Sequence, residues 1–111
     1  MNILISCAGG PAAVGVIKSV SEFNDSTHKV VAIDCDELSV GFHLADKSYV
    51  VPFSVEDDFW KEVLKVIRYE KIDLVIPTGD ADIVHFSKNK NVLRKMGVTV
   101  FMSDYKTIKI C

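Results

Sequence analysis

The sequence predicts an α/β fold with five parallel strands and helices on both faces of the sheet. Short apolar runs rich in β-branched residues alternate along the chain with segments whose apolar residues recur at helical spacing. Because parallel neighbours are joined by right-handed crossovers, a helix is expected between successive strands. We therefore expect a Rossmann-like three-layer sandwich with the strand order 3-2-1-4-5.

Each expected strand is an apolar run that ends at turn residues. The first two runs lack the polar alternation of a half-exposed strand, which is typical of strands buried on both faces. Gly9 and Gly10 follow the first run, Pro52 closes the third and Pro77 closes the fourth. The five runs cover residues 2–6, 29–34, 48–51, 72–76 and 98–102.

Helix signals lie between these runs. Pro11 suits the first position of a helix that carries Ala13, Ile17 and Val20 on its apolar side. Weaker patterns predict a short helix over residues 39–45 and a last turn that runs into Ile110.

Two further helices have clearer start signals. Ser54 and Asp57 have the spacing of a capping box, and Asp80 is expected to cap a helix that runs to about Asn89. The first of these helices carries an apolar stripe at helical spacing, made of Trp60, Val63, Leu64 and Ile67.

Length and composition indicate one cytoplasmic domain over residues 1–111. The 111 residues carry a net charge of −2, which argues against a nucleic acid or an anionic membrane as partner. Three cysteines without a CxxC pair fit a reducing compartment. We find neither an export signal nor an apolar run long enough to cross a membrane.

The expected strand order predicts where a ligand binds. In such sheets the ligand lies beyond the carboxyl ends of the strands where the order reverses, here between residues 7–11 and 77–82. Backbone N–H groups near Gly9, Gly10 and Pro11 would attract an anion, whereas Asp80 and Asp82 would hold a cation. This pairing favours an amino acid or similar zwitterion, although a plain tight turn and helix capping explain the same residues.

The glycine motif matches a nucleotide fingerprint only in part. Gly10 and Gly15 fit the outer glycines of G-x-G-x-x-G, but Ala12 stands where the second glycine belongs. Asp34, with Asp36 beyond it, lies where a ribose-binding carboxylate is expected. A self-sufficient nucleotide or dinucleotide-binding module therefore stays open as the alternative function, and no metal site is expected because the histidines lack ligand spacing.

The order of the motifs resembles a known family. Residues 2–5, 9–12, 31–36, 44–46 and 72–78, with Asp80, together resemble the N-terminal pre-ATP-grasp domain of ATP-grasp ligases, in the branch similar to the carbamoyl phosphate synthase large subunit. The resemblance covers essentially the whole chain. By position, Gly9, Gly10 and Pro11 match the family's first substrate loop, and Thr78 and Asp80 match the loop after the fourth strand.

This resemblance implies a domain that leads a larger enzyme. The enzyme would use ATP and magnesium, bound mainly by the domain that follows, to join a carboxylate or amino acid substrate to an amine. We expect that catalytic domain to be absent from this chain and the chain to be inactive and cofactor-free alone, because no loop at the expected crevice supplies the cations that phosphoryl transfer needs. The resemblance leaves a homodimer open.

Overall fold

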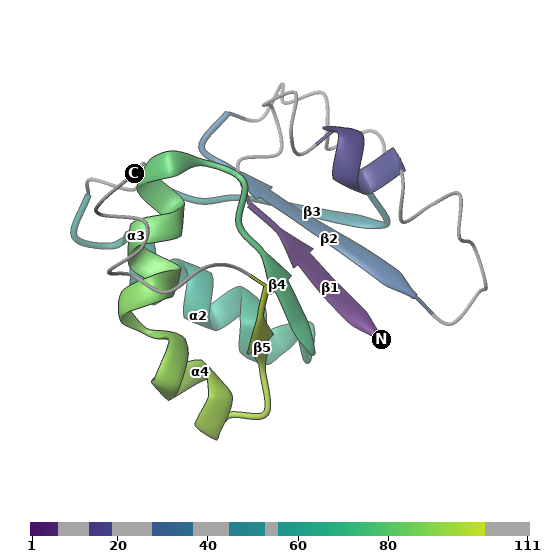
Figure 1. The fold of residues 1–111 in the computed structure, drawn as a ribbon. Coiled ribbons are helices and arrows are strands. Elements are labelled where there is room, and N and C mark those ends of the chain that lie inside the picture. Colours follow the sequence, from purple (N-terminus) through teal and green to yellow (C-terminus); the bar gives the residue numbers. More distant parts are fainter. Residues whose placement is uncertain (7–13, 19–27, 37–44, 53–55, 102–111) are drawn as a thin grey trace.

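One parallel sheet of five strands organises the structure (Figure 1). The computed structural model describes residues 1–6, 14–18, 28–36, 45–52 and 56–101, with the backbone alone for residues 80–82. The strands are β1 (Asn2–Ile5), β2 (Lys29–Asp34), β3 (Lys47–Val50), β4 (Leu74–Ile76) and β5 (Thr99–Val100). Their order is β3-β2-β1-β4-β5, which confirms the predicted α/β class and strand order.

The last two strands are shorter than the sequence predicts because neighbouring helices use part of each apolar run. Ile72 N–H donates to Ile67 O at 3.0 Å, so Ile72 belongs to the turn that ends the preceding helix. Val98 N–H donates to Leu93 O at 2.9 Å in the same way. Both bonds are the six-residue closure that ends a helix at a residue of positive φ, here Lys71 (φ 53°) and Gly97 (φ 84°).

The described helices are residues 14–18, α2 (Phe59–Tyr69), α3 (Asp80–Lys88) and α4 (Lys90–Lys95). Two predicted helix starts were wrong. The N-cap of α2 is Asp58, one residue after the expected capping box, whose Ser54 lies outside the described residues. The N-cap of α3 is Gly79, and Asp80 is the first helical residue.

The end of α3 is close to the predicted position, but the next helix was not foreseen. Asn89 is the C-cap of α3 and the N-cap of α4, and its Nδ2 donates to His85 O at 2.8 Å. The short helix predicted at residues 39–45 and the last turn lie outside the described residues, apart from Ala45, which is in a bend. No helix in the described ranges is long and apolar enough to cross a membrane.

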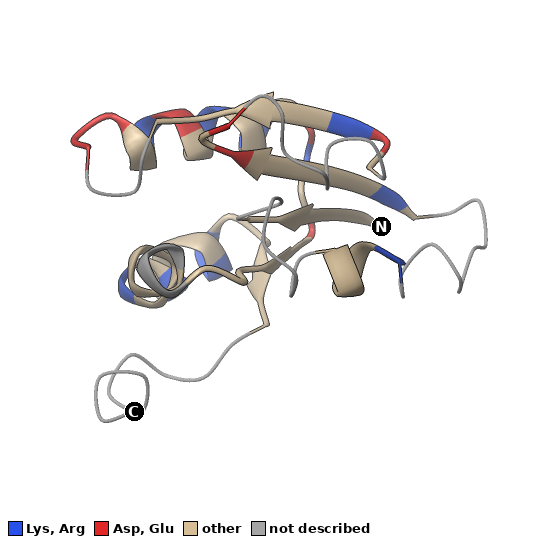
Figure 2. Ribbon diagram, turned by 90° about the horizontal axis from the view of Figure 1, so that it is seen from above, with Lys and Arg blue, Asp and Glu red and all other residues tan. Residues whose placement is uncertain are grey.

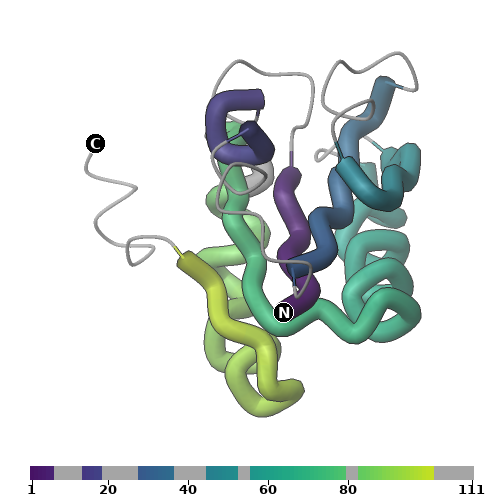
Figure 3. The backbone as a smooth tube through the Cα atoms, turned by 90° about the vertical axis from the view of Figure 1, so that its right-hand side faces the viewer, coloured from purple at the N-terminus to yellow at the C-terminus, as the bar shows by residue number. Residues whose placement is uncertain are grey.

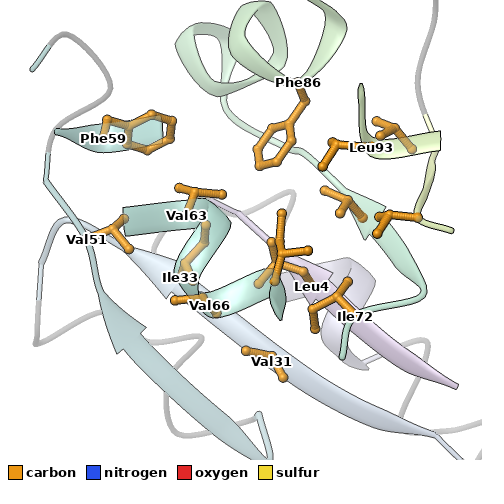
Figure 4. Packing of buried hydrophobic residues seen from close by; sticks show 14 residues of the cluster. Leu4, Val31, Ile33, Val51, Phe59, Val63, Val66, Ile72, Phe86 and Leu93 are labelled. Carbon is orange, nitrogen blue, oxygen red and sulfur yellow. The ribbon is translucent and has the colours of Figure 1, made fainter. Parts of the chain in front are cut away.

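Apolar side chains cover both faces of the sheet, as a three-layer fold requires. Along β1, Leu4 faces α2, α3 and α4, whereas Ile3 and Ile5 pack with Ile17 on the other face. In Figure 3, β1 and β2 lie between the helical turn at residues 14–18 and α2. Figure 4 shows the larger core, in which Phe86 and Leu93 are fully buried.

Aromatic contacts fix α3 against the start of α2. The rings of Trp60 and Phe86 meet edge to face, with centroids 5.4 Å apart, and Phe59 lies 4.9 Å from the ring of His85. This packing holds α3 beyond the carboxyl end of β4.

A buried carboxylate ties α2 to the opposite, amino edge of the sheet. Glu70 is only 5% exposed and accepts hydrogen bonds from Lys29 Nζ, at the start of β2, and from Tyr49 Oη of β3 at 2.5 Å. The backbone oxygen of Glu70 accepts from Asn2 Nδ2 of β1 at 2.8 Å. We call Glu70, Lys29 and Tyr49 the Glu70 anchor, which joins α2 to β2 and β3; the bond from Asn2 adds β1.

The anchor changes the acidity of both of its acids. The hydrogen bond from Lys29, followed by that from Tyr49, holds the pKa of Glu70 below its ordinary value of 4.5. The hydrogen bond to Glu70, followed by burial, raises the pKa of Tyr49 from 10.0 to about 12. The folded state therefore favours an ionised Glu70 and a neutral Tyr49.

Replacement of Glu70 by Gln should cost about 2 kcal/mol of unfolding free energy at neutral pH, because a charge-assisted hydrogen bond contributes roughly 1.5–3 kcal/mol. Since folding lowers the pKa of Glu70, this contribution is complete above pH 4.5 and is lost as the pH falls through the lower folded value. Urea unfolding at a series of pH values should show the two proteins converging in acid. A difference that stays constant from neutral pH into acid would contradict the charged anchor.

Replacement of Tyr49 by Phe should remove a tyrosine ionisation at high pH, near 12. Folding raises the pKa of this phenol, so its stabilising effect is complete below pH 10 and is lost as the pH rises toward 12. Ultraviolet absorbance of tyrosinate should therefore show one of the three tyrosines ionising near pH 12. Tyr69→Phe is the matched control and should keep the titration near pH 12. If that titration disappears in Tyr69→Phe and remains in Tyr49→Phe, the prediction for Tyr49 is wrong.

Candidate functional site at the carboxyl edge

The strand order reverses at β1, which has β2 on one side and β4 on the other. This reversal brings together the starts of the two loops that follow β1 and β4. β1 pairs with β2 on one side and with β4 on the other, with Ile5 opposite Ile76. The chain therefore leaves β1 and β4 side by side at the carboxyl edge. Of the two loops expected to form the crevice, residues 77–82 follow β4 within the described part, whereas Gly9, Gly10 and Pro11 lie outside it.

Ser6 and Thr78 bind the two loop origins to each other. Thr78 Oγ1 donates to Ser6 O at 2.7 Å, and Thr78 N–H donates to Ser6 Oγ at 3.3 Å. Ser6 N–H donates to Ile76 O at 3.4 Å, and Ser6 is fully buried. We call this pair the Ser6–Thr78 clasp. It continues the contact between β1 and β4 past the last residue of each strand and holds the origins of the two loops side by side.

The second loop turns directly into a helix. Pro77 is buried, Gly79 has extended backbone (φ −94°, ψ 139°), and Ile83 N–H donates to Gly79 O at 2.9 Å. Asp80 and Asp82 therefore occupy the first turn of α3, where carboxylates are favoured by the helix dipole. Their position next to the clasp is the predicted one, and their part in binding stays a prediction.

The other two predicted residues lie at the end of β2, next to β1. Asp34 is half-buried, and its Oδ1 accepts the backbone N–H of Cys35 at 2.8 Å. Asp34 O accepts Val51 N–H at 2.9 Å, which ties the end of β2 to the segment after β3. Asp36 is exposed. The local turn already uses one of the Asp34 carboxylate oxygens. The role of Asp34 and Asp36 in nucleotide binding stays a prediction.

Acidic residues gather along the β2 and β3 side of this edge, as Figure 2 shows. They are Asp34, Asp36, Glu56, Asp57 and Asp58. Within the described ranges, the histidines, cysteines and carboxylates form no group of three or more that could hold a metal ion. The described part of the edge thus offers the Ser6–Thr78 clasp and the start of α3.

Sequence reasoning found Thr78 through the family resemblance but missed Ser6 as its partner. The available signal was a small polar residue directly after a buried apolar run and just before a glycine pair. A buried hydroxyl at the end of a strand needs a hydrogen-bond partner, which the neighbouring strand is best placed to supply.

Substitution of Thr78 by Val should cost about 1–3 kcal/mol of unfolding free energy, because it leaves the buried carbonyl of Ser6 without its donor. Thr78→Ser keeps the hydroxyl and should stay within about 1 kcal/mol of the original protein. Chemical denaturation of both variants measures the difference. Thr99→Val, at an exposed position of β5, is the control for loss of a hydroxyl alone. Equal stability of the Thr78→Val and Thr78→Ser variants would show that the clasp contributes nothing.

Comparisons with known proteins identify the family and the fold of this chain. The profile of the family described as "PylC-like, N-terminal domain" matches residues 3–101. No curated protein matches the chain.

Solved structures share the fold. The biotin carboxylase domain of 2-oxoglutarate carboxylase from Hydrogenobacter thermophilus is 17% identical with a TM-score of 0.70, over 96% of this chain and 24% of that one. Glycinamide-RNase-transformylase T from Mycobacterium tuberculosis is 15% identical with a TM-score of 0.73, over 98% and 28%. Pyruvate carboxylase from Rhizobium etli is 20% identical with a TM-score of 0.70, over 98% and 10%.

These likenesses establish the fold, and this chain spans between a tenth and about a quarter of the proteins that share it. The family match covers nearly the whole chain and confirms the expected pre-ATP-grasp type of domain. On that match, the chain belongs to the PylC-like N-terminal domain family.

Proposed function

We propose that this domain leads an ATP-grasp ligase and contributes substrate contacts from the carboxyl edge of its sheet. The observation that carries the proposal is the Ser6–Thr78 clasp, which holds the β1 and β4 loops together at the strand-order reversal of a PylC-like N-terminal domain. Ligands of parallel α/β sheets bind at such a reversal. The catalytic ATP-grasp domain would follow residue 111 or be supplied by a separate chain.

The reaction we propose joins a carboxylate to an amine in two steps. A carboxylate oxygen attacks the γ-phosphorus of ATP, the bond from that phosphorus to the bridging oxygen breaks, and ADP leaves. The amine then attacks the acyl carbon and displaces phosphate. The H. thermophilus domain is described in complex with MgADP, ADP and bicarbonate, which supports a site for nucleotide and a small carboxylate-like anion in a protein of this fold.

In this proposal the domain binds and orients the substrate. Backbone N–H groups near Gly9, Gly10 and Pro11 would receive the substrate's anionic group, and Asp80 and Asp82 would hold its ammonium group. The clasp sets the distance between these two loops. An amino acid carries both charges at a fixed short separation and is therefore the substrate class we favour.

Magnesium and the ATP phosphates would be held by the ATP-grasp domain. Phosphoryl transfer requires Mg²⁺ together with Lys or Arg side chains around the transferring group. We therefore propose that residues 1–111 alone bind substrate without hydrolysing ATP. From the order of the motifs, we further propose that the enzyme belongs to the branch similar to the carbamoyl phosphate synthase large subunit. From the three cysteines without a CxxC pair, we propose that it acts in the cytoplasm.

Calorimetric titration of the common amino acids into the 111-residue chain should find at least one ligand. Asp80→Ala and Asp82→Ala should each weaken its binding about tenfold or more, since a charge-assisted hydrogen bond contributes at least about 1.4 kcal/mol, a tenfold change in Kd. Glu56→Ala removes a carboxylate from the same edge on the β3 side and is the matched control. The chain should release no phosphate from ATP in the same buffer.

Three results would contradict this proposal. Unchanged affinity in both Asp variants would remove the ammonium contact. ATP hydrolysis by the chain alone would contradict the division of labour between the domains. Tight binding of NAD instead of an amino acid would favour the stand-alone nucleotide-binding module, with Asp34 as the ribose ligand.

A further inference from the structure

A groove lies between the edge strand β3 and α2. Its volume is about 370 Å³, and its wall includes Val51 and Val66, which are both buried members of the larger core. Small-molecule sites are mostly apolar hollows of about 300–1,000 Å³ that carry a few polar groups at fixed positions. The volume and the apolar wall of this hollow, which we call the β3–α2 groove, therefore suit one small ligand.

Two tyrosines line the groove, one from the strand and one from the helix. The Tyr49 ring is held in place because its Oη donates to Glu70 at 2.5 Å. Tyr69 directly precedes Glu70 at the end of α2 and is 78% exposed. A ring that is fixed before binding lowers the entropy that binding costs, and contacts between aromatic rings contribute beyond the area they bury. The two tyrosines therefore favour a ligand with a flat ring.

A pair of opposite charges lies on the helix side of the same groove. Lys65 Nζ is 3.2 Å from Glu62 Oε1, and these side chains are 60% and 40% exposed. Among the described residues, neither side chain makes a second ion pair or hydrogen bond. A Lys ammonium has three donors and a carboxylate has several acceptor positions, so the pair has capacity left for a ligand. Because an exposed ion pair contributes little stability, its members can turn toward a ligand at small cost.

The helix sets the distance between these charges and the aromatic ring. Glu62, Lys65 and Tyr69 are spaced three and four residues apart, so they lie along one side of α2. The four residues from Lys65 to Tyr69 rise about 6 Å along the helix axis. A ligand that contacts both positions needs a ring and, about one helical turn away, a head group that satisfies a cation and an anion together.

We propose that the β3–α2 groove binds a free amino acid with an aromatic side chain. The ring packs against Tyr49 and Tyr69. The ligand's carboxylate accepts from Lys65 Nζ, and its ammonium group donates to Glu62. Only the Cβ and Cα atoms separate the ring of such a ligand from its carboxyl carbon, which matches the short span on the helix. Charge complementarity favours the zwitterion, because a ligand with one charge would compensate only one member of the ion pair.

This site is separate from the proposed substrate site. β2 lies between β3 and the β1–β4 pair, and no residue that lines the groove belongs to the loop after β4. A ligand that binds only the folded chain stabilises it, so an amino acid in the groove would strengthen the packing of α2 on β3. It would thus act as an effector of the domain and not as the reactant, and either inference can fail without the other.

Calorimetric titration of L-phenylalanine into the 111-residue chain tests the groove. Tyr69→Ala should raise the Kd about tenfold, because it removes the exposed aromatic wall. Glu62→Gln and Lys65→Gln should each raise the Kd about threefold or more, since each removes one exposed charge contact. Lys61→Gln removes a charge from the same helix at an exposed position outside the groove, and this control should bind like the original protein. Thermal unfolding without ligand verifies that each variant is folded.

Two analogues of phenylalanine test the assignment of the charges. 3-Phenylpropionate lacks the ammonium group and phenethylamine lacks the carboxylate, so both should bind more weakly than phenylalanine. Glu62→Gln should not weaken the binding of 3-phenylpropionate, and Lys65→Gln should not weaken that of phenethylamine. The reverse pattern would contradict the proposed orientation of the ligand.

The variants at the carboxyl edge distinguish this site from the substrate site. Asp80→Ala and Asp82→Ala should leave the Kd of the groove unchanged, and phenylalanine should shift the amide resonances of residues 49–51 and 65–69 in NMR spectra. In Tyr69→Ala, amino acid binding that remains reports on the carboxyl edge alone, so its absence would count against the proposed function and not against the groove.

Three results would overturn the groove as an amino acid site. Phenylalanine could produce neither heat nor amide shifts up to its solubility limit. Tyr69→Ala and Lys61→Gln could have equal affinity for it. Finally, binding could be lost in Asp80→Ala and kept in Tyr69→Ala, which would place the ligand at the carboxyl edge and leave the proposed function standing.

Discussion

The parallel pairing of β1 with β4 is the constraint on which the rest of this structure depends. These strands are more than sixty positions apart in the sequence, yet Ile3, Leu4 and Ile5 lie opposite Leu74, Val75 and Ile76. The pairing creates the reversal of strand order at β1, and ligands of parallel α/β sheets bind at the carboxyl edge of such a reversal. The Ser6–Thr78 clasp continues the same pairing with side-chain hydroxyls where the backbone ladder stops.

Stability and the candidate site occupy opposite edges of the sheet. At the amino edge, Glu70, Lys29 and Tyr49 join α2 to β2 and β3, and Asn2 binds the turn after α2 through Glu70 O and Lys71 O. These contacts are satisfied within the chain. At the carboxyl edge the polar residues sit on loops and helix starts. A fold that fixes its strands at one edge can vary the loops at the other without losing its core, which is how related folds serve many substrates.

The sequence predicted those features that depend on neighbouring residues. The bounds of β2 were predicted residue for residue, because a strand buried on both faces is a continuous apolar run with polar ends. The apolar stripe of α2 was found for a similar reason, although Trp60 and Leu64 are only partly buried and Phe59 and Val66 complete its core face. The short helix α4 was missed because Lys90–Lys95 is mostly polar and is ordered by the burial of Leu93.

Contacts between residues distant in the sequence could not be predicted from local spacing. The clasp joins positions 72 apart, and the bond from Lys29 to Glu70 joins positions 41 apart. Helix starts were misplaced at both α2 and α3 because more than one residue near each start suits an N-cap, and the tertiary packing selects among them.

The common direction of the strands explains both the position of the candidate site and the distribution of charge along α2. In a parallel sheet every strand ends at the same edge, so each following helix begins there with its positive dipole end. Acidic residues are favoured at helix starts, and Asp58, Asp80 and Asp82 all lie at or just inside one. Basic residues are favoured at helix ends, which lie at the amino edge, as Arg68 does. The gradient of charge along α2 is therefore a consequence of parallel topology.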